Sequence, residues 1–143
     1  MAIDQISVFV ENRPGRLVEI TNVLGDANVD MRAMSIADTT DFGILRLIVD
    51  KPEAALSALR EAEYVSSVTQ VVAVRIEDKP GSLSAVLKKL AEGNVSIEYL
   101  YAFITRKTDA AYVVFRLDDN ELGEQLLLEN GFSLASPDEI FSI

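Results

Sequence analysis

The stretch Asn12-Arg13-Pro14-Gly15-Arg16-Leu17 recurs 66 residues later as Asp78-Lys79-Pro80-Gly81-Ser82-Leu83. An Asn-Val pair follows at the same offset, as Asn28-Val29 in the first copy and Asn94-Val95 in the second. Farther along the matching offset becomes 68, which predicts a loop two residues longer in the second copy. A repeat of roughly this size is a whole supersecondary unit. The chain is therefore predicted to be a tandem repeat of two small domains.

The boundaries predicted for these domains are 1–70 and 71–143. Each half lies near or below the roughly 70 to 80 residues at which one hydrophobic core is reliably sufficient, so the halves are expected to pack on each other. Apolar residues make up 49% of the chain and charged residues 25%, which is a globular composition.

The charge balance excludes several classes of function. With 23 acidic and 13 basic side chains the formal charge is −10, which opposes nucleic-acid binding. The sequence has no run of 18 apolar residues and no basic segment at its start, so we expect no membrane span and a cytoplasmic protein. Cysteine and histidine are absent, which removes thiol and imidazole catalysis and the usual zinc sites. We predict that the protein is not an enzyme and has no metal or cofactor.

The first half of each copy is predicted as strand, helix, strand. Alternating apolar residues at 6, 8 and 10 indicate a strand with one buried face. Pro14 suits the first turn of a helix, with Asn12 near its cap. The inner stripes of the two helices are expected to consist of Leu17, Ile20 and Leu24, and of Leu83, Val86, Leu87 and Leu90. Gly25 and Gly93 are expected near the ends of these helices, where glycine tolerates a left-handed conformation.

The next strand changes its apolar phase partway along. Val29 and Met31 are in one phase and Met34 and Ile36 in the other, and the second copy shows the same change. A β-bulge near Arg32 and near its counterpart Glu98 would reconcile the two faces. A third strand is predicted over 44–49.

Each copy is predicted to end with a helix and a fourth strand. The helices start at Pro52 and near Glu121. The fourth strand lies within 65–70 in copy one, and in copy two it is predicted over Glu139 to Ile143, after a turn at 136–138. Because no Gly, Pro or Asn separates Tyr64 from Glu77, the last strand of copy one is expected to run directly into the first strand of copy two.

The order strand, helix, strand, strand, helix, strand is that of the ferredoxin-like split βαβ arrangement, with both helices on one face of an antiparallel sheet. The predicted fold class is α+β, with two βαββαβ repeats whose sheets pack together side by side. The copies differ most where Tyr99, Tyr101 and Phe103 replace three small residues. We interpret this aromatic strip as packing against a partner sheet, with a ligand wall or an interface as the alternatives.

These features resemble the ACT domain, a ferredoxin-like module that binds amino acids as allosteric ligands. Its hallmark is an acidic or amide residue, any residue, Pro-Gly, any residue and Leu, with Asn before the second strand, and both copies contain it. The motifs cover nearly the whole chain, so we expect no attached catalytic domain. The resemblance implies a stand-alone tandem ACT protein that senses an amino acid or regulates a separate enzyme.

A tight turn into a helix N-terminus presents unpaired amides and a positive dipole end, which favour a carboxylate. Glycine in the turn lets a ligand approach the backbone. The resemblance implies that acceptors such as Asn12, Asp78, Asn28 and Asn94 hold the ammonium group at an interface between units. The candidate ligand-binding residues are Asn12, Arg13, Pro14, Gly15, Arg16, Leu17, Asn28, Val29, Asp78, Lys79, Pro80, Gly81, Ser82, Leu83, Asn94 and Val95.

The same residues also have purely structural explanations. The Pro-Gly pairs could be no more than helix starts, Asn28 and Asn94 could only shape a turn, and Arg13 and Arg16 could point into water. The protein could then be a regulatory or scaffold subunit of an amino-acid metabolic enzyme without a ligand of its own. An RNA reader and an acylphosphatase-like enzyme share the topology but lack their signature residues. A homodimer is expected in either case, because small sheets expose edges that pairing would cover.

Overall fold

The structure is a computed structural model that describes residues 2–38, 41–103, 105 and 109–142. Its fold is mixed α+β, and the strand pairs within each unit are antiparallel. The contacts divide the chain into a first unit, residues 4–69, and a second unit, residues 1–3 with 70–143. The boundary that the sequence placed after residue 70 stays a prediction. No helix in the described part of the chain is long and apolar enough to cross a membrane.

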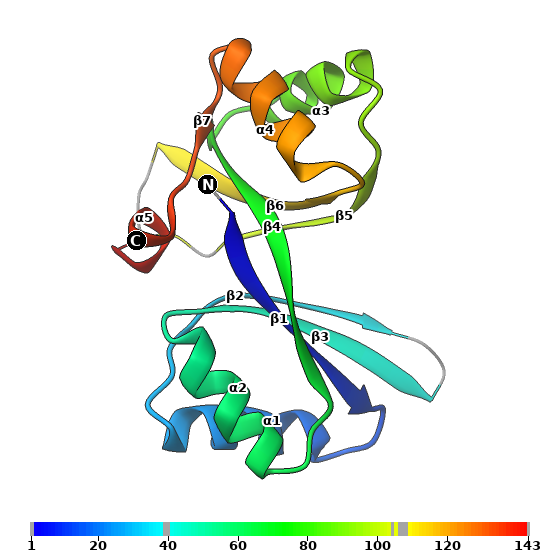
Figure 1. Cartoon of the computed structure of the whole chain (residues 1–143), viewed down its shortest axis with the longest axis vertical. Coiled ribbons are helices and arrows are strands. Elements are labelled where there is room, and N and C mark those ends of the chain that lie inside the picture. Colours follow the sequence, from blue (N-terminus) through cyan, green and yellow to red (C-terminus); the bar gives the residue numbers. More distant parts are fainter. Residues whose placement is uncertain (1, 39–40, 104, 106–108, 143) are drawn as a thin grey trace. The chain divides into compact units, whose positions relative to one another are not determined.

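The first unit has the element order of a ferredoxin-like repeat. Its sheet runs β2-β3-β1, and the Phe9 amide donates to the Val65 carbonyl just before β4 begins (3.0 Å). Both helices lie on one face of the sheet (Figure 1). The elements are β1 (Ile3–Glu11), α1 (Arg16–Asp26), β2 (Met31–Asp38), β3 (Phe42–Val49), α2 (Pro52–Glu61) and the start of β4 (Ser66–Glu77).

The second unit repeats this order with the remainder of β4 as its first strand. Its sheet runs β5-β6-β4, with β7 pairing on the other side of β4, and α3 and α4 share one face (Figure 1). The further elements are α3 (Ser82–Glu92), β5 (Ile97–Ala102), β6 (Ala110–Leu117), α4 (Asn120–Glu129), β7 (Ser133–Leu134) and α5 (Pro137–Ser142). Since β4 is one unbroken strand, the prediction that the copies join without a turn is confirmed.

Equivalent apolar residues fill the two cores. In the first unit, alternate residues of β1 and β3 pack against the inner side of the two helices, where Ile20 and Leu24 are fully buried. Val86 and Leu90 have the same places in the second unit. Leu17 was expected in this stripe, but it is 44% exposed because it lies in the first turn of α1, at the rim of the core.

The predicted β-bulges are present in both units. The pairing of β2 with β3 shifts register between Met31 and Ala33, and that of β5 with β6 between Ile97 and Tyr99. The offset of 68 also holds beyond the bulges, because β3 and β6 begin 68 residues apart. The longer loop itself falls outside the described residues, apart from Phe103, Thr105 and Asp109.

The prediction for the fourth strand of the second copy is wrong. Glu139 to Ser142 belong to helix α5, and the strand is β7, which pairs with Val74 and Arg75 of β4. Ser136 starts α5 by accepting the Glu139 amide (3.2 Å), and Ile140 is fully buried. Ile140 is therefore buried from a helix and not from a strand, while the neighbouring Phe141 is exposed. In the same unit, Phe103 packs edge-on against Tyr112, with ring centroids 6.2 Å apart.

Glycine is also not the left-handed residue that follows α1 and α3. Asn28 (φ 58°) and Asn94 (φ 60°) take that conformation, while Gly25 and Gly93 do not. Each Asn is followed by a valine whose amide bonds back to the last turn, Val29 to Leu24 (3.0 Å) and Val95 to Leu90 (2.9 Å). This is the Schellman arrangement, in which Asn is the usual substitute for Gly.

Two glycines inside helices should respond in opposite ways to alanine. A Cβ at Gly25 in α1 would meet nothing within 4 Å, so Gly25→Ala should raise the free energy of unfolding by about 0.5–1 kcal/mol. A Cβ at Gly123 in α4 would overlap the buried side chain of Leu117, so Gly123→Ala should lower it by about 1–3 kcal/mol. Urea denaturation measures both changes, and a Gly123→Ala protein as stable as the parent would contradict this account of the packing.

Candidate functional site

Each Pro-Gly pair forms a tight turn that precedes a helix. Gly15 has φ 90° and ψ −16°, and the Arg16 amide donates to the Arg13 carbonyl (3.3 Å). Gly81 has φ 88° and ψ −11°, with the matching bond from Ser82 to Lys79 (3.3 Å). These are the features of a type II turn, which has proline at its second position and glycine at its third. The prolines therefore precede the helices, and the prediction that they occupy the first helical turn is wrong.

The two helices begin without a side-chain cap. Gly15 and Gly81 are the N-cap residues, and neither can supply a capping oxygen. Asn12 was predicted near the cap, but its backbone amide donates to the Asp41 carbonyl (3.0 Å). The backbone amide of Asp78 donates to the Asp109 carbonyl in the same way (3.3 Å). In the described part of the chain, the Leu83 and Ser84 amides have no hydrogen-bond acceptor. Such amides at the positive end of a helix dipole favour an anion.

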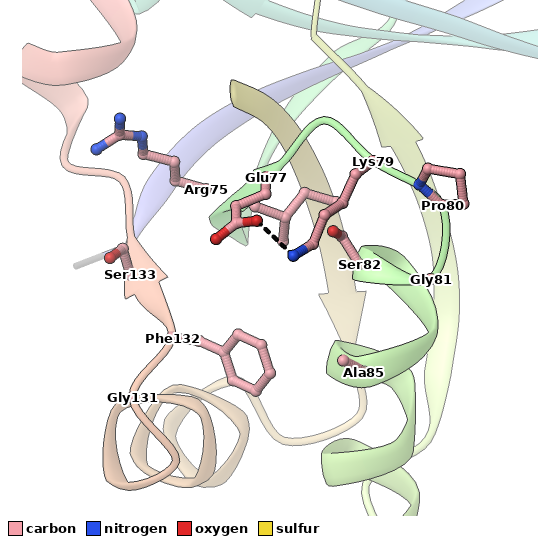
Figure 2. Close-up of a pocket in the computed structure, with 11 residues that line it drawn as sticks. Arg75, Glu77, Lys79, Pro80, Gly81, Ser82, Ala85, Gly131, Phe132 and Ser133 are labelled. Atoms are coloured by element: carbon pink, nitrogen blue, oxygen red, sulfur yellow. Dashed lines mark ion pairs between the residues drawn. The ribbon is translucent and has the colours of Figure 1, made fainter. Parts of the chain in front are cut away.

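A cavity of about 500 Å³ opens beside the start of α3. We call it the second-repeat pocket (Figure 2). The end of β4, the Pro-Gly turn and the loop between α4 and β7 form its walls, and the Phe132 ring lies across from Ser82 and Ala85. Its lining consists of Arg75, Ile76, Glu77, Lys79, Pro80, Gly81, Ser82, Ala85, Gly131, Phe132 and Ser133.

Three charged side chains line the second-repeat pocket. Glu77 and Lys79 form an ion pair (2.7 Å), which lowers the pKa of Glu77 and raises the pKa of Lys79 (Figure 2). Both groups are exposed, so solvent screens this pair and it adds little to stability. The exposed Arg75 guanidinium has no partner among the described residues. The pocket therefore has one cationic group that is free to bind an anion.

The first unit has a cavity of about 400 Å³ in the equivalent place, which we call the first-repeat pocket. Positions on β1 and α1 correspond at offset 66, and those after α2 at offset 68. Arg16 and Glu19 thus stand where the second unit has Ser82 and Ala85. The lining consists of Phe9, Glu11, Arg16, Glu19, Phe42, Ala62, Glu63, Tyr64 and Val65.

Side chains within the first-repeat pocket bind one another. The Arg16 guanidinium contacts the carboxylates of Glu19 (3.4 Å) and Glu11 (3.8 Å). The buried Tyr64 hydroxyl lies beside this cluster. Burial first, and then the Glu19 carboxylate, raise the pKa of Tyr64, while Arg16 lowers it. The neutral phenol is thus favoured at the edge of an acidic cluster.

The predicted site residues separate into several groups. Lys79, Pro80, Gly81 and Ser82 line the second-repeat pocket, and Arg16 lines the first. Asn12, Arg13 and Leu17 line a separate cavity of about 320 Å³ in the first unit. Pro14 and Gly15 shape the turn, and Leu83 packs against the core of the second unit.

The Asn-Val pairs lie at the other end of the helix. With a rise of about 1.5 Å per residue, the 11-residue helices place Asn28 and Asn94 about 16 Å or more from their own Pro-Gly turns. Val29 and Val95 are buried in the cores. A small ligand at one turn could therefore contact an Asn only if that Asn came from another unit or another chain.

Arg75, Phe132 and Ser133 line the second-repeat pocket but were not among the residues predicted from the sequence. They flank the turn from β4 and from the loop after α4, and no motif links those segments. One signal was present, because Phe132 matches Tyr64 at offset 68 and both aromatic residues follow a left-handed residue, Gly131 (φ 82°) or Glu63 (φ 67°). Among the described residues, no group of three or more acidic side chains could hold a metal ion.

Comparison with known proteins identifies the fold over its whole length. The sequence profile described as "ACT domain pair" matches residues 1–143. The crystal structure of protein BT0572 from Bacteroides thetaiotaomicron is 36% identical, with a TM-score of 0.94, and the match covers 100% of this chain and 98% of that one. No curated protein matches the chain.

A more distant similarity extends to regulatory subunits. The regulatory subunit of aspartate kinase from Thermus thermophilus, in its ligand-free form, matches at 15% identity with a TM-score of 0.64. That match covers 90% of this chain and 92% of the subunit. The regulatory subunit from Thermus flavus matches at 13% identity and a TM-score of 0.62, covering 88% of this chain and 90% of that one. At these identities the similarity shows the fold alone.

The acidic cluster of the first-repeat pocket can be tested through Tyr64. Because the pKa of Tyr64 is raised, the stability that its neutral form provides is present at neutral pH and is lost as pH rises through the folded pKa, above 10. Glu19→Gln should bring this pKa closer to 10, while burial keeps it raised. Ultraviolet titration of the phenolate, assigned with Tyr64→Phe, measures the change. Glu63→Gln is the control, and an unchanged pKa in Glu19→Gln would contradict the arrangement.

Proposed function

Because the chain belongs to the ACT domain pair family, we propose that it is a non-catalytic regulatory protein that binds an amino acid at its Pro-Gly turns. The observation that carries this proposal is the second-repeat pocket, where a cavity of about 500 Å³ meets an uncapped helix N-terminus and an unpaired guanidinium. Pockets that bind small molecules combine an apolar wall with a few convergent polar groups, and this pocket has both.

The carboxylate of the ligand would bind at the start of α3. Unpaired amides of the first turn would donate to it. The positive charge of Arg75, which lies on β4 across the pocket and extends away from the turn (Figure 2), would attract it at longer range. A Cβ at Gly81 would meet nothing within 4 Å, so the open side of the turn leaves room for the ligand. The left-handed conformation of Gly81 (φ 88°) holds the turn in the shape that exposes these amides.

The rest of the amino acid would lie between the turn and the loop after α4. Glu77 would accept from the ammonium group, and the side chain would lie along Ile76, Ala85 and Phe132. Asn28 and Asn94, which the ACT resemblance implicates, would contribute only from a neighbouring unit or chain. The interface between ACT units that the resemblance implies stays a proposal, and the second-repeat pocket is lined by residues of the second unit alone.

A second candidate function is a regulatory or scaffold subunit that binds a partner enzyme without a ligand. The observation that favours it is an apolar surface on the first unit, where Leu17, Met34, Ile36 and Phe42 are each at least 44% exposed. Leu17, Ile36 and Phe42 line a cavity of about 320 Å³, and Leu17, Met34 and Ile36 line one of about 210 Å³. A clustered apolar surface of this kind marks a protein contact, either a homodimer or a metabolic enzyme in the cytoplasm.

A thermal-shift screen against the twenty amino acids tests the first function. A ligand of the native state should raise the melting temperature in a dose-dependent way, which corresponds to about 2.7 kcal/mol at a concentration of 100 Kd. Arg75→Met should weaken the response to the ligand at least tenfold, because it removes the unpaired cation. Arg60→Met removes an exposed arginine of α2 and should leave the response unchanged.

The two candidate functions differ in this screen. A flat response to all twenty amino acids, with the fold intact by circular dichroism, would reject amino-acid sensing and favour the subunit function. A response that Arg75→Met leaves unchanged would keep the sensor function but remove the second-repeat pocket as its site.

A further inference from the structure

The two pockets are equivalent in the repeat but opposite in charge. We propose that the chain binds one amino acid per molecule, in the second-repeat pocket alone, and that the first-repeat pocket holds no ligand carboxylate because its own side chains already occupy that role. The ligand class is an α-amino acid with an uncharged, apolar side chain. This inference rests on the proposed function and determines which of the two turns performs it.

The helix dipoles of the two units are compensated differently. Glu19 lies in the first turn of α1 and places a carboxylate at the positive end of that helix. The first turn of α3 contains no acidic residue. Negative charge at a helix N-terminus is stabilising, and the effect falls off within the first turn. The first unit therefore supplies its own anion, whereas the second leaves this position for an anion from solution.

The side chains that line each pocket reinforce this difference. The first-repeat pocket has the three carboxylates of Glu11, Glu19 and Glu63 against the single cation of Arg16. The second-repeat pocket has the cations of Arg75 and Lys79 against the carboxylate of Glu77. When Arg13, which pairs with Glu11 (2.7 Å) as Lys79 pairs with Glu77, is counted with the first pocket, the formal charges are −1 and +1. A ligand carboxylate is repelled from the first pocket and attracted to the second.

The lining also differs in shape. Arg16 contacts both Glu11 (3.8 Å) and Glu19 (3.4 Å), so long charged side chains line the first-repeat pocket at these positions. The corresponding positions in the second unit are Ser82 and Ala85, whose short side chains leave the start of α3 open toward Phe132 (Figure 2). With Ile76 and Phe132 as the apolar wall, an apolar ligand side chain fits better than a charged one.

The proposal is tested on the full chain by exchanging Arg16 and Glu19 of the first unit with their counterparts, Ser82 and Ala85, in the second. The ligands for calorimetry are L-valine, L-leucine and L-phenylalanine, with L-aspartate and L-lysine as charged comparisons. We expect one equivalent of an apolar amino acid per chain and at least tenfold weaker binding of the charged ones. Ser82→Arg with Ala85→Glu copies the first-repeat pocket into the second unit and should weaken binding at least tenfold. Both positions are at the surface or half-buried, and a thermal melt verifies the fold.

The reciprocal variant is the matched control. Arg16→Ser with Glu19→Ala should leave the affinity of the existing site within twofold. Two equivalents per parent chain, loss of binding in this reciprocal variant, or unchanged binding in Ser82→Arg with Ala85→Glu would each overturn the inference while leaving amino-acid sensing intact. Tighter binding of L-aspartate or L-lysine would overturn the ligand class. Absence of binding by all twenty amino acids would reject the proposed function and this inference together.

Discussion

The positive φ of Gly15 and Gly81 is the constraint on which the arrangement of both repeats depends. A residue with a Cβ is strained in that conformation, whereas glycine adopts it readily after proline in a type II turn. The turn reverses the chain between the first strand and the first helix of each unit and thereby sets the buried stripe of that helix on its sheet. It also leaves the helix without a side-chain cap. One backbone conformation thus serves the fold and creates the unsatisfied amides that make an anion site available.

The repeats have kept what the fold requires and changed what surrounds it. Both units retain the turn, the bulge and the Schellman end of the first helix. Both also retain a carboxylate that accepts a backbone amide just before the second strand. Asp50 accepts from the Asp30 amide (2.8 Å), and Asp118 accepts from the Ser96 amide (3.0 Å). The Glu-to-basic ion pair beside the turn is also kept, as Glu11–Arg13 and Glu77–Lys79. The pocket linings differ in the first helical turn and after the second helix, and the units also differ in the aromatic strip at 99, 101 and 103 and in α5. A changed pocket lining beside a retained turn is what separate functions for the two turns would produce.

Much of the fold follows from the sequence because the repeat supplies each pattern twice. The change of apolar phase at Arg32 would be weak alone, but its recurrence at Glu98 made the bulges predictable. The prediction of a C-terminal strand was wrong for the opposite reason. The first unit has no counterpart of α5, and a short apolar pair fits the period of a strand as well as that of a helix. The candidate site was only partly predictable. Asn28 is near Gly15 in sequence, yet the helix between them separates the two, while Arg75 and Phe132 are distant in sequence and line one cavity. A sequence motif identifies residues that are close in the sequence, whereas a pocket is formed by residues that are close in space.

The continuity of β4 has a consequence for the history of this chain. Residues 66–69 of that strand belong to the first unit and residues 70–77 to the second, and residues 1–3, with the buried Ile3, also belong to the second unit. A duplicated ancestor would have been complete in each half, but no single cut now releases two intact domains. The exchange runs one way, because the second unit includes residues 1–3 from the start of the chain, whereas the first unit, residues 4–69, includes no residue of the second half. A cut between the repeats would therefore separate residues 1–3 from the unit that they contact.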